Sequence, residues 1–551
     1  MADTALDKFE SIDGSKLGEL SHLSNFEVTA DFRKIAPPDN LNGNEPIDVG
    51  RGNPNWINTT ARLAQGRMVE FGIKDSERTF TKDNGAMAGY IEMDGIEDRF
   101  KEFMNPENPA DQLLLNTVKY ATDELGINGD EMVHEMADGA IGNHYPVPSR
   151  SLVNVEKILN KYLEKALYRG AELANETELF PTEGGAASMV YIFNEMKLSH
   201  ILEPGDKVAI NTPIFTPYLE IPILKEYNLE IVPLLSSEDN DWQMTDEQLD
   251  QLKDPSIKAF FDVNPTNPAA RAFSNHALDK IKEVVEANPK LTIVTDDVYG
   301  TFAEGFKTIY SVVPHNTLLV YSFSKLFGVT GHRLGLTAAH KDNVFDQIIA
   351  EKTAANPEIK AEFEDRYSKV VTDPLHMKFI DRMVADSRAI GLYHVAGLST
   401  PQQIMMELLA ANNLTVGDDT YLDASREVVG ERYNAFWNGL GVDADESEGN
   451  TKYYTLINIP TLMEKSYNKD FSDWYVKNYN YLDFSYRLVR EFGAVIMDAS
   501  SFGANEGYVR ISLANMPTES YAKIAEYMKE LLAQYYAEYQ KIINNNSKSG
   551  L

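Results

Sequence analysis

Polar side chains follow three consecutive apolar runs of the chain, at the point where each run ends. They are an amide, a carboxylate, a phenol and an amine: Asn267, Asp296, Tyr299 and Lys325. In open α/β sheets, ligands bind where the carboxyl ends of the strands meet. If the apolar runs are strands of such a sheet, these four groups converge on one site.

A glycine-rich segment and an arginine could add an anion site to this group. In "PTEGGAASMVYIF", Gly184 and Gly185 precede a helical pattern, so exposed backbone N–H groups and a helix N-terminus could bind an anion. Arg333 follows Lys325 by eight residues and offers a planar fork of donors. Taken alone, the glycines also fit an ordinary turn, and Lys325 alone fits a solvated surface lysine.

Together these groups meet the needs of one cofactor, pyridoxal phosphate. Its aldehyde requires an amine, its pyridine nitrogen requires a carboxylate that keeps a proton there, and its O3′ requires hydrogen-bond donors. Lys325, Asp296 and Tyr299 are of the right types, and the glycine segment could take the phosphate. The combination therefore predicts a pyridoxal-phosphate enzyme.

An alternation of short apolar runs with longer helical stretches between about 180 and 340 predicts the elements that position these groups. Helical patterns such as 276–288 lie between several of the runs. This alternation predicts an α/β fold in which helices wrap a mainly parallel mixed sheet. Six runs are expected to be buried strands: 206–210, 229–235, 257–263, 291–296, 317–322 and 334–339.

At 551 residues the chain exceeds the usual size of one compact domain, so we expect two domains. Residues 61–400 are expected to form the large, cofactor-binding domain. Residues 1–60, which include a substrate loop, and residues 401–551 are expected to form a smaller α+β domain. Two helical, polar and acidic regions inside the large domain, about 85–140 and about 341–396, are interpreted as insertions.

Composition excludes several classes of protein. Lys and Arg number 51 against 84 Asp and Glu, and the resulting net charge of −33 argues against nucleic-acid or anionic membrane partners. Zero cysteines exclude disulfides and thiol catalysis. The segment "VHEMAD" places Asp138 where a zinc helix needs its second histidine, so no metal site is expected. The N-terminus lacks the features of a signal peptide and no apolar run reaches the ~20 residues of a bilayer span, so we expect a cytoplasmic protein.

The segment "SFSKLFGVTGHRLG" (322–335) resembles the "SxSKxxxxxGxRxG" segment of the fold-type-I pyridoxal-phosphate enzymes, the aspartate aminotransferase superfamily. This resemblance implies that Lys325 is the Schiff-base lysine and that Asp296 holds the pyridinium. It also implies that Tyr299 and Asn267 lie on O3′. The phosphate contacts that it implies are Gly184, Gly185, Ala186, Ser322, Ser324 and Arg333.

The resemblance extends to residues outside that segment. Phe215 matches the aromatic ring stacked on the pyridine, and Tyr145 matches a tyrosine that reaches the phosphate of the neighbouring subunit. Gly52 matches the glycine of the substrate loop, and Arg510 matches the arginine that grips the substrate α-carboxylate bidentately. One departure is that the usual "NPTG" after the first strand of the site is "NPAA" here, beginning with Asn267.

The segments "GRGNPNW" (50–56) and "HYPVPSR" (144–150), together with the two insertions, are similar to a narrower group, the aspartate 4-decarboxylases, which also transaminate aspartate. This similarity implies that L-aspartate is converted to L-alanine and carbon dioxide. A side transamination to oxaloacetate would involve a 2-oxo acid. The group also implies a homo-oligomer, a large assembly built from active-site dimers. Arg51 is the candidate contact for the distal carboxylate of aspartate, and the alternative is a surface arginine beside a turn.

Two other functions fit parts of the sequence. A plain aspartate or aromatic aminotransferase with decorative insertions would use the same cofactor residues. A transcription regulator with an aminotransferase-like sensor domain would need a basic DNA-binding module, and neither end of the sequence offers one.

Overall fold

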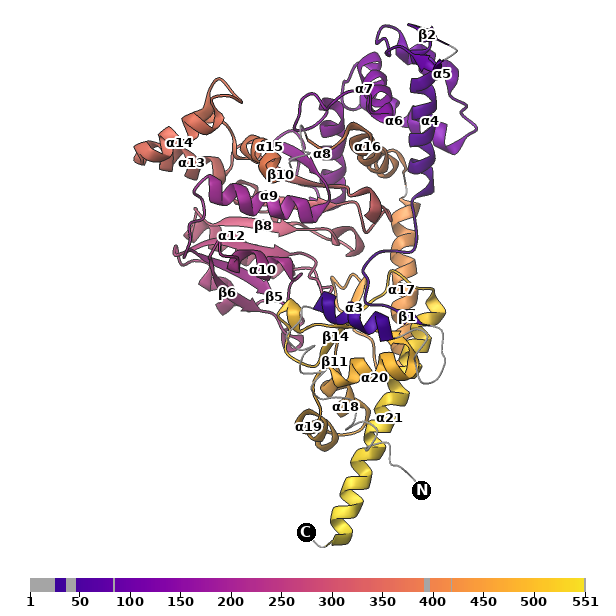
Figure 1. Ribbon diagram of the computed structural model, residues 1–551, viewed down its shortest axis with the longest axis vertical. Coiled ribbons are helices and arrows are strands. Elements are labelled where there is room, and N and C mark those ends of the chain that lie inside the picture. Colours follow the sequence, from indigo (N-terminus) through magenta and orange to yellow (C-terminus); the bar gives the residue numbers. More distant parts are fainter. Residues whose placement is uncertain (1–24, 36–45, 83–84, 391–396, 418, 550–551) are drawn as a thin grey trace.

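The computed structural model describes residues 25–35, 46–82, 85–390, 397–417 and 419–549. A central sheet covered by helices forms the middle of the molecule, and a second, smaller unit lies below it in Figure 1. From this smaller unit the long helix α21 (Thr518–Ser549) projects away from the sheet. Within the described ranges, each helix is too short or too polar to span a bilayer.

Seven strands form the central sheet: β4 (Thr177–Thr182), β5 (Lys207–Thr212), β6 (Glu230–Leu235), β7 (Ile257–Val263), β8 (Thr292–Asp296), β9 (Thr317–Ser322) and β10 (Gly335–His340). Their order is β4–β10–β9–β8–β7–β5–β6. Strand β10 runs antiparallel to both of its neighbours, and all other pairs are parallel. The predicted α/β fold with a mainly parallel mixed sheet is confirmed, and each of the six expected strands is present.

Strand β4 was not predicted. Its sequence "TELFPT" contains a proline and begins and ends with polar residues, so it lacks the continuous apolar pattern of the other strands. Pro181 is tolerated because β4 lies at the edge of the sheet, where only one neighbour requires hydrogen bonds. Pro233 occupies the opposite edge strand, β6, for the same reason.

Helices on the sheet bury one apolar face each. The first of these helices to follow a strand is α9, which packs on β4, β9 and β10. In α12, the helix predicted at 276–288, Ala277, Leu278, Ile281 and Val284 are buried at helical spacing. The helices that flank the sheet or support its edges are α8 (Val153–Leu167), α9 (Gly185–Leu198), α10 (Pro217–Ile223), α11 (Asp246–Gln251) and α12 (Asn275–Ala287). Helix α16 (Thr400–Thr415) packs on α8.

The two regions interpreted as insertions add helices outside the sheet. The first contains β3 (Met87–Ala88), α5 (Ile96–Phe103), α6 (Pro109–Asp123) and α7 (Gly129–Ile141). It packs with α4 (Thr59–Ser76) and α16 at the top of Figure 1, and β3 pairs with β2 (Thr81–Lys82). The second contains α13 (Val344–Ala355), α14 (Pro357–Tyr367) and α15 (Phe379–Ile390), and α15 packs on α9. In the described part of the chain, neither region extends the central sheet.

The smaller unit combines segments from both ends of the chain. Strand β1 (Ile47–Asp48) pairs in parallel with β12 (Ala494–Val495), and α3 (Asn25–Ile35) packs on α20 (Asp483–Phe492). A three-stranded antiparallel sheet, β11–β14–β13, forms its centre: β11 (Tyr454–Asn458), β13 (Met497–Asp498) and β14 (Tyr508–Ser512). Its other helices are α17 (Thr420–Leu440), α18 (Ile459–Ser466), α19 (Lys469–Asn478) and α21. Of the segment 1–60 expected here, residues 1–24 and 36–45 lie outside the described residues.

Candidate active site

A cavity of about 350 Å³ lies at the carboxyl ends of β7, β8 and β9, where the smaller unit meets the central sheet. Strand β8 pairs with β7 and β9, so the residues that follow these strands share one edge of the sheet. Twelve of the residues predicted for the site line this cavity: Gly52, Gly185, Ala186, Phe215, Asn267, Asp296, Tyr299, Ser322, Ser324, Lys325, Arg333 and Arg510.

Lys325 lies in the turn that follows β9, and its amine points into the cavity. Its Nζ donates to the carbonyl oxygen of Gly52 at 3.0 Å. The turn is held at its start because the backbone N–H of Ser324 donates to the hydroxyl of Ser322, which in turn donates to the carbonyl of Leu334. Among the described residues that line the cavity, Lys325 carries the only amine.

Asp296 ends β8 and is almost fully buried. Burial raises the pKa of its carboxyl to about 6, although the backbone N–H of Val298 and the hydroxyl of Tyr218 donate to it and the Lys325 ammonium lowers the pKa further. The two hydrogen bonds and the lysine therefore do not fully offset the free-energy cost of burying the ionised carboxylate. A cation beside it, such as a protonated pyridine nitrogen, would stabilise its ionised form.

The glycine-rich end of the cavity has the features of an anion site. Gly184 precedes α9 with φ +89° and offers no side chain to cap the helix. A Cβ on Gly184 would lie 2.6 Å from Nη2 of Arg333, and a Cβ on Gly335 would lie 2.5 Å from the carbonyl carbon of Gly184. The glycines thus allow the guanidinium and the start of α9 to approach one another. Uncapped N–H groups beside an arginine fit the phosphate of pyridoxal phosphate.

Arg510 reaches the opposite side of the cavity from β14, the middle strand of the small sheet. Its side chain is 4% exposed, and it donates to the side-chain oxygen of Asn267 at 3.0 Å and to the carbonyl of Gly50 at 2.9 Å. Its Nε is buried and has no hydrogen-bond partner among the described residues. Nη1 and Nη2 each use only one of their two N–H groups in these bonds, and the remaining ones fit a carboxylate ligand in the cavity.

Three of the predicted site residues do not line the cavity. Gly184 lies behind it, against Arg333. The Tyr145 side chain is 72% exposed, in the loop before α8, so its predicted contact with a neighbouring subunit stays a prediction. The Arg51 side chain is 62% exposed, and its Nε lies 3.7 Å from Oδ2 of Asp48. The role predicted for Arg51 also stays a prediction.

Several residues of the cavity were not predicted. Tyr454 lines it from the start of β11, and its hydroxyl lies 2.8 Å from that of Tyr299. The Tyr218 hydroxyl donates to Asp296, and the side chains of Val263 and Val298 form an apolar part of the cavity wall. The doublet "YY" at the start of the alternating pattern "YYTLINI" could have drawn attention to Tyr454. Its contact with Tyr299 spans 155 positions and leaves no local signal.

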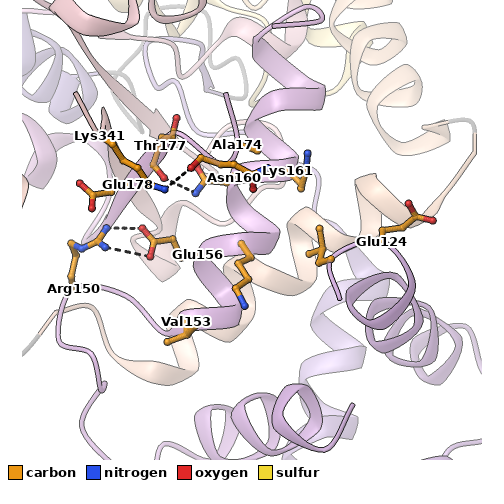
Figure 2. A pocket seen from close by; sticks show the side chains of 13 residues that line it. Glu124, Arg150, Val153, Glu156, Asn160, Lys161, Ala174, Thr177, Glu178 and Lys341 are labelled. Carbon is orange, nitrogen blue, oxygen red and sulfur yellow. Dashed lines mark hydrogen bonds and ion pairs between the residues drawn. The ribbon is translucent and has the colours of Figure 1, made fainter. Parts of the chain in front are cut away.

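A second cavity, of about 550 Å³, lies at the other end of β4 (Figure 2). Thr177 pairs with His340 there, whereas Thr182 pairs with Gly335 at the active-site end. Two of its charged side chains pair with one another, since Arg150 donates to both carboxylate oxygens of Glu156. None of the residues predicted for the site lines it.

Comparisons with known proteins agree with this geometry. Residues 143–528 match the family model described as aminotransferase class I and II. The chain is 40% identical, over 526 residues, to a bifunctional aspartate aminotransferase and L-aspartate β-decarboxylase of a Pseudomonas species, which covers 95% of this chain and 98% of that protein.

Solved structures share the fold. A double mutant of Thermus thermophilus aspartate aminotransferase superposes with a TM-score of 0.59 at 16% identity, over 92% of this chain and 96% of that one. The aromatic aminotransferase of Pyrococcus horikoshii gives a TM-score of 0.55 at 19% identity, over 92% and 99%.

Proposed function

Because the chain belongs to the class I and II aminotransferase family, we propose that it is a pyridoxal-phosphate enzyme that removes the β-carboxyl group of L-aspartate to give L-alanine and carbon dioxide. Transamination of aspartate to oxaloacetate, with a 2-oxo acid as acceptor, is its second activity. The observation that carries the cofactor chemistry is that one cavity joins Lys325, Asp296 and Arg510. The choice of decarboxylation is supported by the similarity to the Pseudomonas enzyme over nearly the whole chain.

Each polar residue of the cavity would have its own role in the reaction. Pyridoxal phosphate, when bound, supplies an electron sink for the bonds broken at the substrate. Lys325 would attach the cofactor and, once displaced by the substrate amine, would carry the proton that leaves Cα. Asp296 would hold the proton on the pyridine nitrogen. Arg510 would bind the α-carboxylate through the N–H groups of Nη1 and Nη2 that its bonds to Asn267 and Gly50 leave over.

The distal carboxylate must be held and then released. Loss of carbon dioxide leaves the bonding electron pair on the substrate, and Cβ takes up a proton in exchange. We propose that Arg51, one residue before Gly52 of the cavity wall, contacts this carboxylate. The apolar side chains of Phe215, Val263 and Val298 line the cavity. With cofactor and substrate bound, they would limit the access of water to the carboxylate, which would favour loss of its charge.

We also propose a homo-oligomer built from active-site dimers and a cytoplasmic location. The exposed Tyr145 supports the dimer, because a side chain that is 72% exposed in one subunit could reach the phosphate site of another. Analytical ultracentrifugation tests the assembly, and a monomer with full activity would contradict this proposal.

The reaction is tested by giving the purified, cofactor-loaded protein L-aspartate without any 2-oxo acid. We expect alanine and carbon dioxide in many-fold excess over active sites. A plain aminotransferase would instead stop at one equivalent of oxaloacetate per site, and that result would refute decarboxylation. The Lys325→Ala variant is the control and should form neither product.

A further inference from the structure

Two adjacent tyrosines at the start of β11 bring the smaller unit into the active site. Tyr454 is 2% exposed and Tyr453 is fully buried. The Tyr453 hydroxyl donates to the carbonyl of Gly52 at 2.9 Å, the same oxygen that accepts from Lys325. The Tyr454 hydroxyl lies 2.8 Å from the Tyr299 hydroxyl. The two phenols therefore contact both the lysine side and the O3′ side of the proposed cofactor site.

Tyr454 also lies beneath the carboxylate-binding arginine. The guanidinium carbon of Arg510 is 4.4 Å from the centre of the Tyr454 ring. This distance is typical of a cation–π contact. The charged groups near the two tyrosines are Arg510, Arg432 beside Tyr453 and, across Gly52, Lys325. Tyr454 thus contacts both Tyr299 and Arg510.

The direction of the hydrogen bond between Tyr299 and Tyr454 follows from a count of protons. Each phenol has one proton to donate. Burial raises the pKa of Tyr299 well above its ordinary value, so its hydroxyl stays protonated. If Tyr299 donates its proton to O3′, as the proposed function requires, its oxygen can only accept from Tyr454. The chain of donors then runs from Tyr454 to Tyr299 to O3′.

We propose that Tyr454 is a positioning residue that donates its proton to Tyr299 and holds Arg510 with its ring. The inference rests on the proposed function, because it assigns Tyr299 to O3′ of pyridoxal phosphate. A donor that itself accepts a hydrogen bond is polarised and donates more strongly. Tyr454 therefore strengthens the hydrogen bond from Tyr299 to O3′. A stronger bond to O3′ would lower the pKa of the nearby nitrogen that joins Lys325 to the cofactor.

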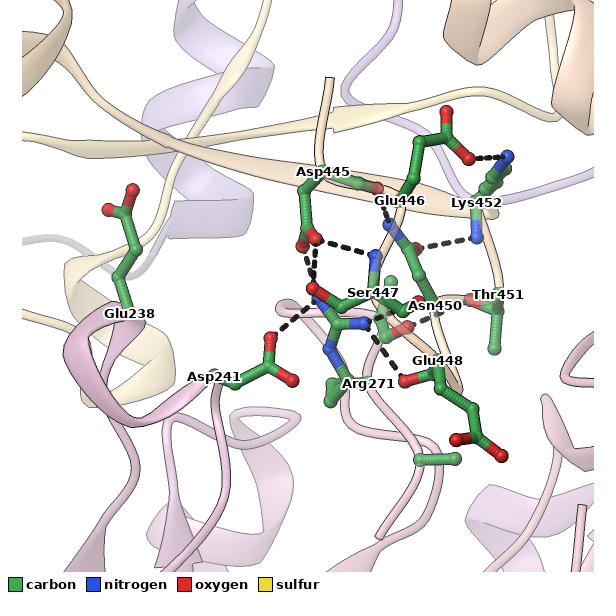
Figure 3. Close-up of polar contacts among 12 residues, drawn as sticks. Glu238, Asp241, Arg271, Asp445, Glu446, Ser447, Glu448, Asn450, Thr451 and Lys452 are labelled. Carbon is green, nitrogen blue, oxygen red and sulfur yellow. Dashed lines mark hydrogen bonds and ion pairs between the residues drawn. The ribbon is translucent and has the colours of Figure 1, made fainter. Parts of the chain in front are cut away.

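A buried arginine fixes the chain just before these tyrosines (Figure 3). Arg271 is 1% exposed, forms ion pairs with Asp241 and Asp445, and donates to the carbonyls of Ser447 and Glu448. Beside it, the backbone N–H of Thr451 donates to the carbonyl of Ala270 at 2.9 Å. Arg271 belongs to the turn that follows Asn267, the partner of Arg510. The segment that carries the tyrosines is therefore attached to the turn that carries a ligand of the site.

The test is the pH dependence of the visible absorbance of the resting, cofactor-loaded enzyme, which reports the pKa of the lysine–cofactor nitrogen without any turnover. Tyr454→Phe keeps the ring and removes the hydroxyl. We expect this pKa to rise by about half a unit in Tyr454→Phe. The rise should be smaller than in Tyr299→Phe, because the variant keeps the hydrogen bond from Tyr299 to O3′ and loses only the neutral hydrogen bond from Tyr454 to Tyr299. The KM for aspartate should stay within about twofold because the ring remains under Arg510. Tyr454→Leu should raise the KM about tenfold as well.

The matched control is Tyr453→Phe, which removes the adjacent hydroxyl and leaves the link between Tyr454 and Tyr299 intact. If the pKa rose as much in Tyr453→Phe as in Tyr454→Phe, the role of Tyr454 would be refuted. It would also be refuted if the pKa rose clearly in Tyr299→Phe but stayed unchanged in Tyr454→Phe. If Tyr299→Phe itself caused no rise, the assignment of Tyr299 to O3′ would fall, and this inference with it. Neither result depends on whether aspartate is decarboxylated or transaminated.

Discussion

Asp296→Asn is expected to stabilise the protein without cofactor while abolishing its activity. Burial raises the pKa of Asp296 from 3.8 to about 6. At about 1.4 kcal/mol per pH unit, the ionised carboxylate then destabilises the folded state by roughly 3 kcal/mol. The asparagine is neutral at every pH and can still accept from the N–H of Val298. The variant should therefore be more stable by up to about 3 kcal/mol at pH 8.

The sign of the effect depends on pH and on the cofactor. The pKa of Asp296 is higher in the folded than in the unfolded state, so its protonated form contributes stability below about pH 4, and this contribution is lost as the pH rises through 6. The advantage of the variant should therefore vanish at low pH. With pyridoxal phosphate bound, the carboxylate gains a cationic partner. The neutral asparagine cannot make this charge interaction, so with cofactor bound the variant should be less stable than the parent protein.

The measurement is the unfolding midpoint at fixed protein concentration, at pH 4.5 and pH 8, with the cofactor removed and restored. Asp498 provides a control, since burial also raises its pKa to about 6 and it lies outside the cavity. Asp498→Asn should change stability by the same amount with and without cofactor. The reasoning is refuted if cofactor-free Asp296→Asn is less stable than the parent protein at pH 8, or if its advantage is equal at both pH values.

Three further substitutions, one of them with a matched control, test the site. Lys325→Ala should leave no cofactor that borohydride can fix to the protein, and mass spectrometry of the reduced protein checks this; a fixed cofactor elsewhere would refute the assignment. In Gly52→Ala, the new Cβ would lie 2.1 Å from the Tyr454 hydroxyl, so kcat/KM should fall about 100-fold. The control is Gly66→Ala in α4, whose new Cβ would meet no atom within 4 Å, and this variant should keep full activity. A similar loss of kcat/KM in both variants would show that the contact with Tyr454 is not its cause. Arg51→Ala should raise the KM for aspartate about tenfold and leave the affinity for alanine unchanged, whereas equal losses would assign Arg51 another role.

The strands and most of the cavity could be predicted because their signals are local. Buried parallel strands are continuous apolar runs, and the residues after them must meet at one edge of the sheet. Asp296 and Lys325 were found in this way. Arg333 was predicted from its place eight residues after Lys325 and from the resemblance of the segment 322–335, and the structure shows it close to Gly184.

The residues that were missed depend on tertiary contacts. Tyr454 enters the cavity because β11 pairs with β14, which places Leu456 opposite Arg510. Nothing near Tyr454 in the sequence reports this pairing. Similarly, Tyr218 supports Asp296 from 78 positions away. The side chain of Arg51 pairs with Asp48, and no sequence pattern indicates which of several nearby carboxylates it meets.

The departure from the family pattern after Asn267 has a structural explanation. Ala270 stands where "NPTG" has glycine, and it adopts φ +60°, a left-handed conformation that disfavours a Cβ by roughly 1–2 kcal/mol. The turn keeps this conformation because it is held on both sides: Thr266 accepts from Ala270 and donates to Arg271 through its backbone, and the carbonyl of Ala270 accepts from Thr451. With Arg271 buried next to it, the turn is a docking point for the smaller unit. The chain thus tolerates a strained alanine at a position whose contacts fix both Asn267 and the tyrosines of β11.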